Sequence, residues 1–256
     1  MVKIELINMK DRHSAITDGV FAIAMTILVL EIAVPTISDI SSGVALSQYF
    51  TNYLVPAILI YFISFYLVYT FWENTILLFT FKRVSNPILT LNMIAMATVC
   101  LIPFATGFLF EFYMYKDANI FFSALILIIS LLYVMIFLLL VRLNFKKYFE
   151  KKEEIKASIH ESYDDGVEFS NLKLYVRGVT LTLFYLLLTP AIGSLISLVL
   201  AFISPIASIM SFIVVLILRF AIRMKRTRTD KLQNIEITDD EREFLDKLRE
   251  SIYGDE

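Results

Sequence analysis

Six long apolar runs constrain the fold of this chain more than any other feature of its sequence. A helix needs about 20 predominantly apolar residues to cross the hydrocarbon core of a bilayer. The runs lie at roughly 14–34, 50–72, 88–110, 119–141, 173–198 and 204–222, with boundaries good to about 2–4 residues. We therefore predict an all-α integral membrane protein in which residues 1–224 form a domain of six transmembrane helices.

The boundary between the last two runs is weakly marked, because the apolar signal hardly stops between Leu172 and Met224. We place the turn at Ser204–Pro205, since proline is best tolerated at the start of a helix. Pro190 then lies inside the fifth helix and is expected to kink it. A turn at Pro190 itself is the competing interpretation.

The basic residues predict the orientation of these helices. Of the 23 lysines and arginines, 22 fall in the segments that lie on one side of the membrane if there are six spans, and only Lys116 falls on the other. Cytoplasmic segments carry the excess of basic residues. We therefore expect a multi-pass protein of the cell membrane with both termini and a linker at about 142–171 in the cytoplasm. The basic stretch from Arg219 to Arg228 is expected to contact anionic lipid at the membrane surface.

The composition excludes several classes of function. The chain is 58% hydrophobic and 19% charged, with a mean hydropathy of +0.71. One cysteine and two histidines argue against a disulfide framework and a transition-metal centre. A net charge of −2 gives no reason to expect nucleic acid as a partner. We predict no catalytic residues, no metal site and no cofactor, and we read the charges around His160 and Asp164 as a solvated run.

The cytoplasmic tail, residues 225–256, carries one helical signal. Thr238 to Glu241 read Thr-Asp-Asp-Glu, which is a capping box at a helix start. Leu245, Leu248 and Ile252 follow on one helical face. We expect a short amphipathic helix that docks on a partner or a neighbouring subunit, and a solvated tail helix is the alternative.

The first run contains the most informative residues. Ile23, Thr26, Ile27 and Leu30 recur at helical spacing and share one stripe, about 10 Å long along the axis. Such stripes usually contact lipid or other helices, so periodicity alone assigns no role. Asp18 lies at the cytoplasmic end of this run. An acidic group there either faces protein or water, or is a first-turn anion among the headgroups.

The sequence around Asp18 resembles a known family. The pattern Arg12-x-x-x-Ile16-Thr17-Asp18 is similar to the Arg-x-x-x-Phe-Ser-Asp signature of the transmembrane protein 175 family, which comprises endolysosomal potassium channels and their bacterial homologues. The likeness extends through Glu31 to Pro35. Two positions depart from the signature: Thr17 retains the hydroxyl of serine, whereas Ile16 loses an aromatic contact.

The second and third runs add to the resemblance, through Trp72 and Asn92 and through the segment Leu101–Phe104. A histidine that often follows the family's tryptophan by three positions is Thr75 here. The last three runs match the family only in length and hydropathy. The clear resemblance thus covers a little under half of the chain.

The resemblance implies a homotetramer whose first helices line one central pore that potassium ions permeate. Carried over by position, Ile23, Ile27 and Leu30 form constricting apolar rings and Thr26 a hydroxyl ring beside them. The positions expected to hold the pore helix in place are Arg12, Thr17, Asp18, Trp72 and Asn92. Glu31 would place a charge at the outer mouth.

A pore of this kind differs from the usual potassium filter, because the sequence contains no Thr-Val-Gly-Tyr-Gly loop to supply carbonyl ligands. Apolar constrictions gate by dewetting. They also penalise K⁺ less than Na⁺, because K⁺ holds its water less tightly. The resemblance therefore predicts moderate potassium selectivity. A secondary transporter and a non-conducting assembly factor are the alternatives, although deep ionisable residues and broken helices, which transporter sites use, are scarce.

Overall fold

The computed structural model describes residues 2–34, 46–79, 85–160 and 170–232, and these segments are almost entirely helical. The elements in chain order are α1 (Val2–Leu30), α3 (Leu46–Tyr49), a π-helical turn η1 (Phe50–Leu54), α4 (Val55–Phe79), α5 (Asn86–Val99), α6 (Ile102–Phe112), α7 (Lys116–His160), α8 (Ser170–Ala201) and α9 (Pro205–Leu232). The predicted helix in the tail beyond Thr238 lies outside the described residues.

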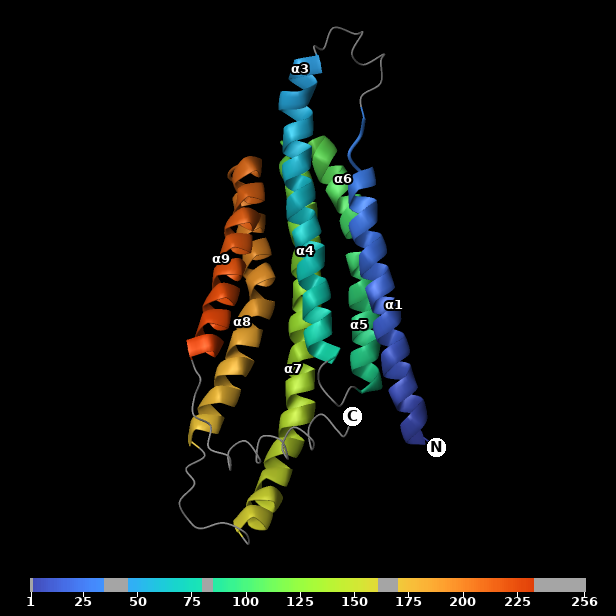
Figure 1. Ribbon diagram of the computed structural model, residues 1–256. Helices are drawn as coiled ribbons and strands as arrows, with labels where there is room; N and C mark the ends of the chain where they lie inside the picture. Colours follow the sequence, from blue (N-terminus) through green and yellow to red (C-terminus); the bar gives the residue numbers. More distant parts are fainter. Residues whose placement is uncertain (1, 35–45, 80–84, 161–169, 233–256) are drawn as a thin grey trace.

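Six stretches in these helices are long and apolar enough to cross a membrane. The predicted all-α membrane protein with six spans is therefore confirmed, and the chain is a multi-pass membrane protein. The start of α1 and the end of α9 lie at the same end of the bundle (Figure 1), as an even number of spans requires. The side of the membrane on which they lie stays a prediction. α7 continues as a helix beyond its span, to His160, through much of the predicted linker.

Prolines mark several helix boundaries. Pro87 lies in the first turn of α5, and Pro205 begins α9. Proline suits these positions because the first amide groups of a helix have no partner inside it. The predicted turn at Ser204–Pro205 is confirmed, and Pro190 lies within the continuous helix α8.

The third span differs from the single helix predicted for 88–110. It is divided into α5 and α6 by a short turn at Cys100–Leu101. Pro103 explains the break, because it has no amide hydrogen and its ring would clash with the carbonyl of Val99, four residues earlier. The Leu101 amide instead donates to the carbonyl of Thr98, and α6 starts anew with Pro103 in its first turn.

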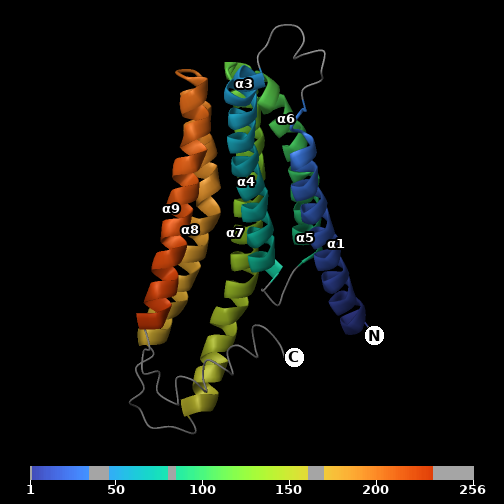
Figure 2. The same ribbon diagram turned by 45° about the horizontal axis from the view of Figure 1, so that its top comes forward.

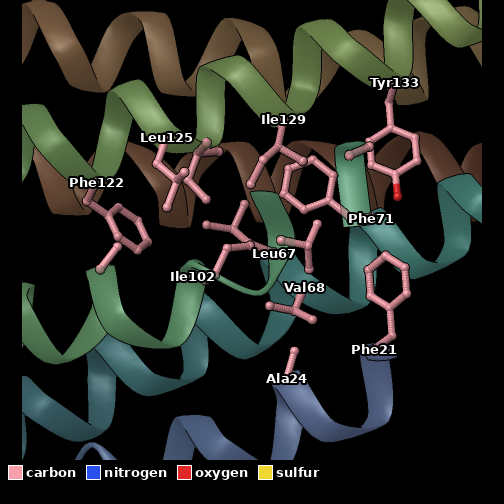
Figure 3. Packing of buried hydrophobic residues seen from close by; sticks show 14 of the residues in the cluster. Phe21, Ala24, Leu67, Val68, Phe71, Ile102, Phe122, Leu125, Ile129 and Tyr133 are labelled. Atoms are coloured by element: carbon pink, nitrogen blue, oxygen red, sulfur yellow. The ribbon is translucent and has the colours of Figure 1, made fainter. Parts of the chain in front are cut away.

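The helices form one elongated bundle with α4 and α7 between two flanking groups (Figures 1 and 2). α1 packs against α4, α5 and α6 on one side, while α8 and α9 pair with each other and pack along α7 on the other. The core between these helices is apolar and aromatic. The ring of Tyr133 in α7 stacks on Phe71 of α4, with centroids 5.6 Å apart, and its hydroxyl lies 2.7 Å from the Thr75 hydroxyl. Phe21 and Ala24 of α1 point into the same core (Figure 3).

The close contact between α8 and α9 depends on Gly193. A Cβ atom at this position would lie 2.5 Å from Cγ2 of Val215 on α9. We expect Gly193→Ala to lower the free energy of unfolding by up to about 2 kcal/mol, because overpacking against stiff, β-branched Val215 exceeds the gain in helix propensity. Unfolding titrations in mixed micelles measure this change. Adding Val215→Ala should restore much of the loss, and a Gly193→Ala protein as stable as the wild type would contradict the argument.

Candidate functional site: the first transmembrane helix

The two faces of α1 have opposite environments. Thr17, Phe21, Ala24 and Leu28 are buried against the rest of the subunit. The opposite face carries the predicted stripe and points away from the subunit. The exposed fractions of its apolar side chains are 60% for Ile23, 37% for Ile27 and 79% for Leu30. Sequence reasoning had placed these residues on one face, and the structure shows that this face is unpacked within a single subunit.

Thr26 interrupts the apolar stripe with a hydroxyl group. Its side chain is exposed, and its hydroxyl donates a hydrogen bond to the Ile23 carbonyl, 2.8 Å away. Because the hydrogen is directed back to the helix, the oxygen lone pairs remain available on the exposed face. Such an oxygen is a suitable acceptor for a hard cation or for a water molecule.

Asp18 is held by the second span. The indole nitrogen of Trp72 on α4 donates to Oδ1 of Asp18 at a distance of 2.8 Å. This is a charge-assisted hydrogen bond, a stronger class than neutral ones, and it joins α1 to α4. Arg12 is exposed, and among the described residues Asp18 is bound by Trp72 rather than by Arg12. The structure therefore brings Asp18 and Trp72 together and leaves Arg12 apart.

Thr17 and Asn92 meet at His13, a residue that the sequence analysis did not single out. The Thr17 hydroxyl donates to the backbone carbonyl of His13 at 2.8 Å. Nδ2 of Asn92 on α5 lies 3.0 Å from Nε2 of the His13 ring. His13 thus links the start of the first span to α5. A polar residue one turn before Thr17 is the only signal that could have indicated it.

The Trp72–Asp18 hydrogen bond gives a testable stability effect. Trp72→Phe removes the N–H donor and leaves the Asp18 carboxylate without it, so we expect the free energy of unfolding in mixed micelles to fall by about 1.5–3 kcal/mol. Asp18→Asn is the matched comparison, because it keeps an acceptor oxygen for Trp72 and should lose less. Equal stability of Trp72→Phe and wild type would show that this bond does not fasten α1.

Glu31, which directly follows α1, packs its carboxylate against Gly107 of α6 in the same chain. A Cβ atom at Gly107 would lie 2.2 Å from Oε2 of Glu31, so the carboxylate occupies space that only glycine leaves free. Glu31 is half-buried there. The expected outer-mouth charge is therefore seated against its own subunit at the end of the stripe.

One charged residue lies deeper than the sequence predicted. Arg219, which we had grouped with the surface-anchor stretch, is buried, with 4% of its surface exposed. It forms an ion pair with Glu73 of α4. The expectation for Arg219 is wrong because hydropathy shows where a charge falls along a helix but not which neighbour neutralises it.

Part of this chain is similar in sequence to known potassium channels. The family model described as "Endosomal/lysosomal potassium channel TMEM175" matches residues 12–103, which run from Arg12 through the break before α6. A potassium channel of Chryseobacterium sp. (strain P1-3) is 28% identical over 177 residues, which cover 69% of this chain and 84% of that protein. A potassium channel of Streptomyces collinus is 33% identical over 108 residues, 41% of this chain and 50% of that protein.

One solved structure shares the fold. The crystal structure of a lysosomal potassium-selective channel TMEM175 homolog from Chamaesiphon minutus has a TM-score of 0.58 and 22% sequence identity, and the match covers 85% of this chain and 98% of that chain. The range matched by the family model contains α1 from Arg12 onward, together with Trp72 and Asn92. The family is a channel family rather than a class of enzymes. This chain is therefore similar to the TMEM175 family over residues 12–103 and shares the fold of a solved TMEM175 homolog.

Proposed function

We propose that this chain is the subunit of a potassium-selective channel, in which four copies assemble so that α1 of each lines one central pore. The observation that carries the proposal is the unpacked apolar face of α1, formed by Ile23, Ile27 and Leu30. In the apolar window of α1 22% of the residues are buried, compared with 28% in the last span and 44% to 50% in the other four. A helix so sparsely packed in its own subunit, in a family of potassium channels, is well suited to face copies of itself around a pore.

The pore acts through apolar rings rather than through carbonyl ligands. Ile23, Ile27 and Leu30 each contribute one side chain per subunit to a ring that is narrow and poorly wetted. An ion that enters must give up part of its hydration, and the side chains return little in exchange. K⁺ gives up less hydration free energy than Na⁺ in this step. A constriction from which water is expelled also stops ion flow. The same rings therefore serve as filter and gate, with K⁺ as the permeant ion and no cofactor.

The Thr26 ring supplies polar atoms within this apolar stretch. Its hydroxyl hydrogen is bonded to the Ile23 carbonyl, so the oxygen presents lone pairs to the pore. Four such oxygens would replace part of the water that an ion sheds at the neighbouring rings. We assign Thr26 to partial rehydration of K⁺ between constrictions.

The remaining site residues hold α1 in place. Asp18 is bonded to Trp72, and Thr17 and Asn92 converge on His13, so α4 and α5 both restrain the entry side of the helix. Arg12 lies exposed at the start of the span, where a neighbouring subunit or lipid headgroups would contact it. Glu31, seated on Gly107, restrains the opposite end and adds negative charge near the outer mouth. We place the channel in the cell membrane with both termini in the cytoplasm.

Purified protein in liposomes tests the proposal directly. Passive, electrogenic K⁺ flux is the expected result, together with a tetrameric mass by native mass spectrometry. Single-channel recording with K⁺ on one side and Na⁺ on the other then measures selectivity. Saturable flux coupled to a second ion would instead indicate a secondary transporter, and no flux from a well-folded oligomer would indicate an assembly factor.

A further inference from the structure

A buried arginine inside the last span is the feature that the proposed function leaves unexplained. Arg219 lies in the middle of α9 and within the membrane-spanning stretch Pro205–Ile222. Its side chain is 5% exposed. Ionisable residues inside a span are costly and are normally retained for a role, with a partner that offsets their charge.

The binding site for this guanidinium is built partly by a proline. Nη1 of Arg219 donates to the carbonyl oxygen of Leu186 on α8. Leu186 lies four residues before Pro190, and a proline has no amide hydrogen for that carbonyl. The Thr189 hydroxyl also donates to it, at 2.8 Å. Pro190 therefore frees the backbone acceptor that Arg219 uses.

The other half of the binding site comes from α4. Nη2 of Arg219 donates to Oδ1 of Asn74 at 3.1 Å and lies 3.4 Å from Oε2 of Glu73. The guanidinium thus bridges α8, α9 and α4 with donors on two nitrogens. Lysine could not reproduce this arrangement, because its ammonium is a point charge without the planar fork of arginine.

A continuous path of contacts leads from this site to the pore-side helix. Oε1 of Glu73 accepts a hydrogen bond from the Tyr69 hydroxyl at 2.9 Å. The Tyr69 ring packs against the ring of Trp72, with centroids 5.7 Å apart. Trp72 in turn donates to Asp18 on α1. One turn of α4 therefore has Arg219 on one side and Asp18 on the other.

We propose that Arg219 is a positioning residue for the pore helix: it orients the 69–74 turn of α4 and, through Trp72, the Asp18 side of α1. Its effect on conduction rests on the proposed channel function, whereas its effect on Trp72 does not. The α8–α9 pair, which lies away from α1, thereby influences how often the pore is open. Ion selectivity should be unaffected, because none of these contacts involves the exposed stripe of α1.

The single tryptophan of the chain allows a direct test. The emission spectrum of Trp72 is measured for purified wild type, R219Q and the control R142Q, which makes the same substitution at an exposed residue of α7. D18A, which removes the acceptor of the indole, provides the reference spectrum. We expect R219Q to shift the emission toward that of D18A and R142Q to leave it unchanged. An R219Q spectrum identical to wild type overturns the proposal.

The second measurement is K⁺ flux in liposomes with the same variants. R219Q should change flux by about 2- to 30-fold, the range typical of residues along a coupling path, with an unchanged K⁺/Na⁺ permeability ratio. R219K, which keeps the charge, should recover only part of the wild-type value. A shifted Trp72 spectrum with wild-type flux overturns the role in conduction.

Two further outcomes are a wild type that carries no K⁺ and an R219Q variant that does not assemble, and the measurements distinguish them. If wild type carries no K⁺, the proposed function fails, and the Trp72 spectra alone decide whether Arg219 acts on this contact path. If R219Q does not assemble because Glu73 loses its ion pair, E73Q/R219Q removes both charges together and is measured in its place. An unchanged Trp72 spectrum in that double variant overturns the proposal.

Discussion

Replacing Ile23 with Asn is expected to abolish most of the discrimination between K⁺ and Na⁺. An amide at this position widens the ring and supplies polar atoms that hold water, so an ion no longer has to dehydrate there. We expect the permeability ratio to fall by about tenfold, equivalent to about 1.4 kcal/mol in the difference between the two barriers. Under bi-ionic conditions the reversal potential then moves toward zero by about 59 mV.

The matched control is Ile128→Asn on α7. Ile128 is also exposed on the subunit surface, at 52% compared with 60% for Ile23, but it lies outside the stripe. It therefore reports any general effect of placing an amide on a membrane-facing surface. An unchanged reversal potential in Ile23→Asn, or an equal change in both variants, would remove Ile23 from the pore.

Replacing Phe21 with Ala is expected to have the largest effect on folding. Phe21 lies two residues before Ile23 but on the buried face, with 1% of its surface exposed, and its ring points into the core beside Phe71 (Figure 3). Truncating a buried Phe leaves a cavity and costs about 3–5 kcal/mol. We expect a matching fall in the free energy of unfolding in mixed micelles, with loss of the assembled oligomer at moderate temperature.

Ile16→Ala is the comparison for this variant. Ile16 lies on the same helix but is 61% exposed, so its truncation should lower the free energy of unfolding of the subunit only slightly. Comparing the free energies of unfolding of Phe21→Ala and Ile16→Ala therefore distinguishes the buried face of α1 from its exposed face. Similar losses in both variants would mean that α1 does not pack against the rest of the subunit through its Phe21 face.

The spans and their boundaries could be predicted because the signals are local. The length of each apolar run matches the number of residues that a helix needs to cross the bilayer. Pro205 marks a helix start because proline is tolerated in the first turn of a helix but not in its interior. The same reasoning predicted a helical stripe from Ile23 to Leu30, since 3.6 residues per turn determine which side chains share a face. The break at Cys100–Leu101 was missed, although Pro103 indicated it, because apolar content stays continuous across the turn.

The partners of the polar residues could not be predicted in the same way. Arg12 and Asp18 are six residues apart in sequence, yet Asp18 binds Trp72, which is 54 residues away. Arg219 and Glu73 are 146 residues apart. His13 has no distinctive pattern around it and acquires its contact with Asn92 only when α1 packs against α5.

Taken alone, the sequence determined that this chain crosses a membrane six times and that α1 carries an apolar stripe with one hydroxyl, because both properties follow from residues near one another along a helix. Only the tertiary structure decided which face of α1 is left unpacked and which acceptors surround Arg219. Those outcomes depend on packing between distant helices, where a carbonyl freed by Pro190 and a carboxylate on α4 meet one guanidinium.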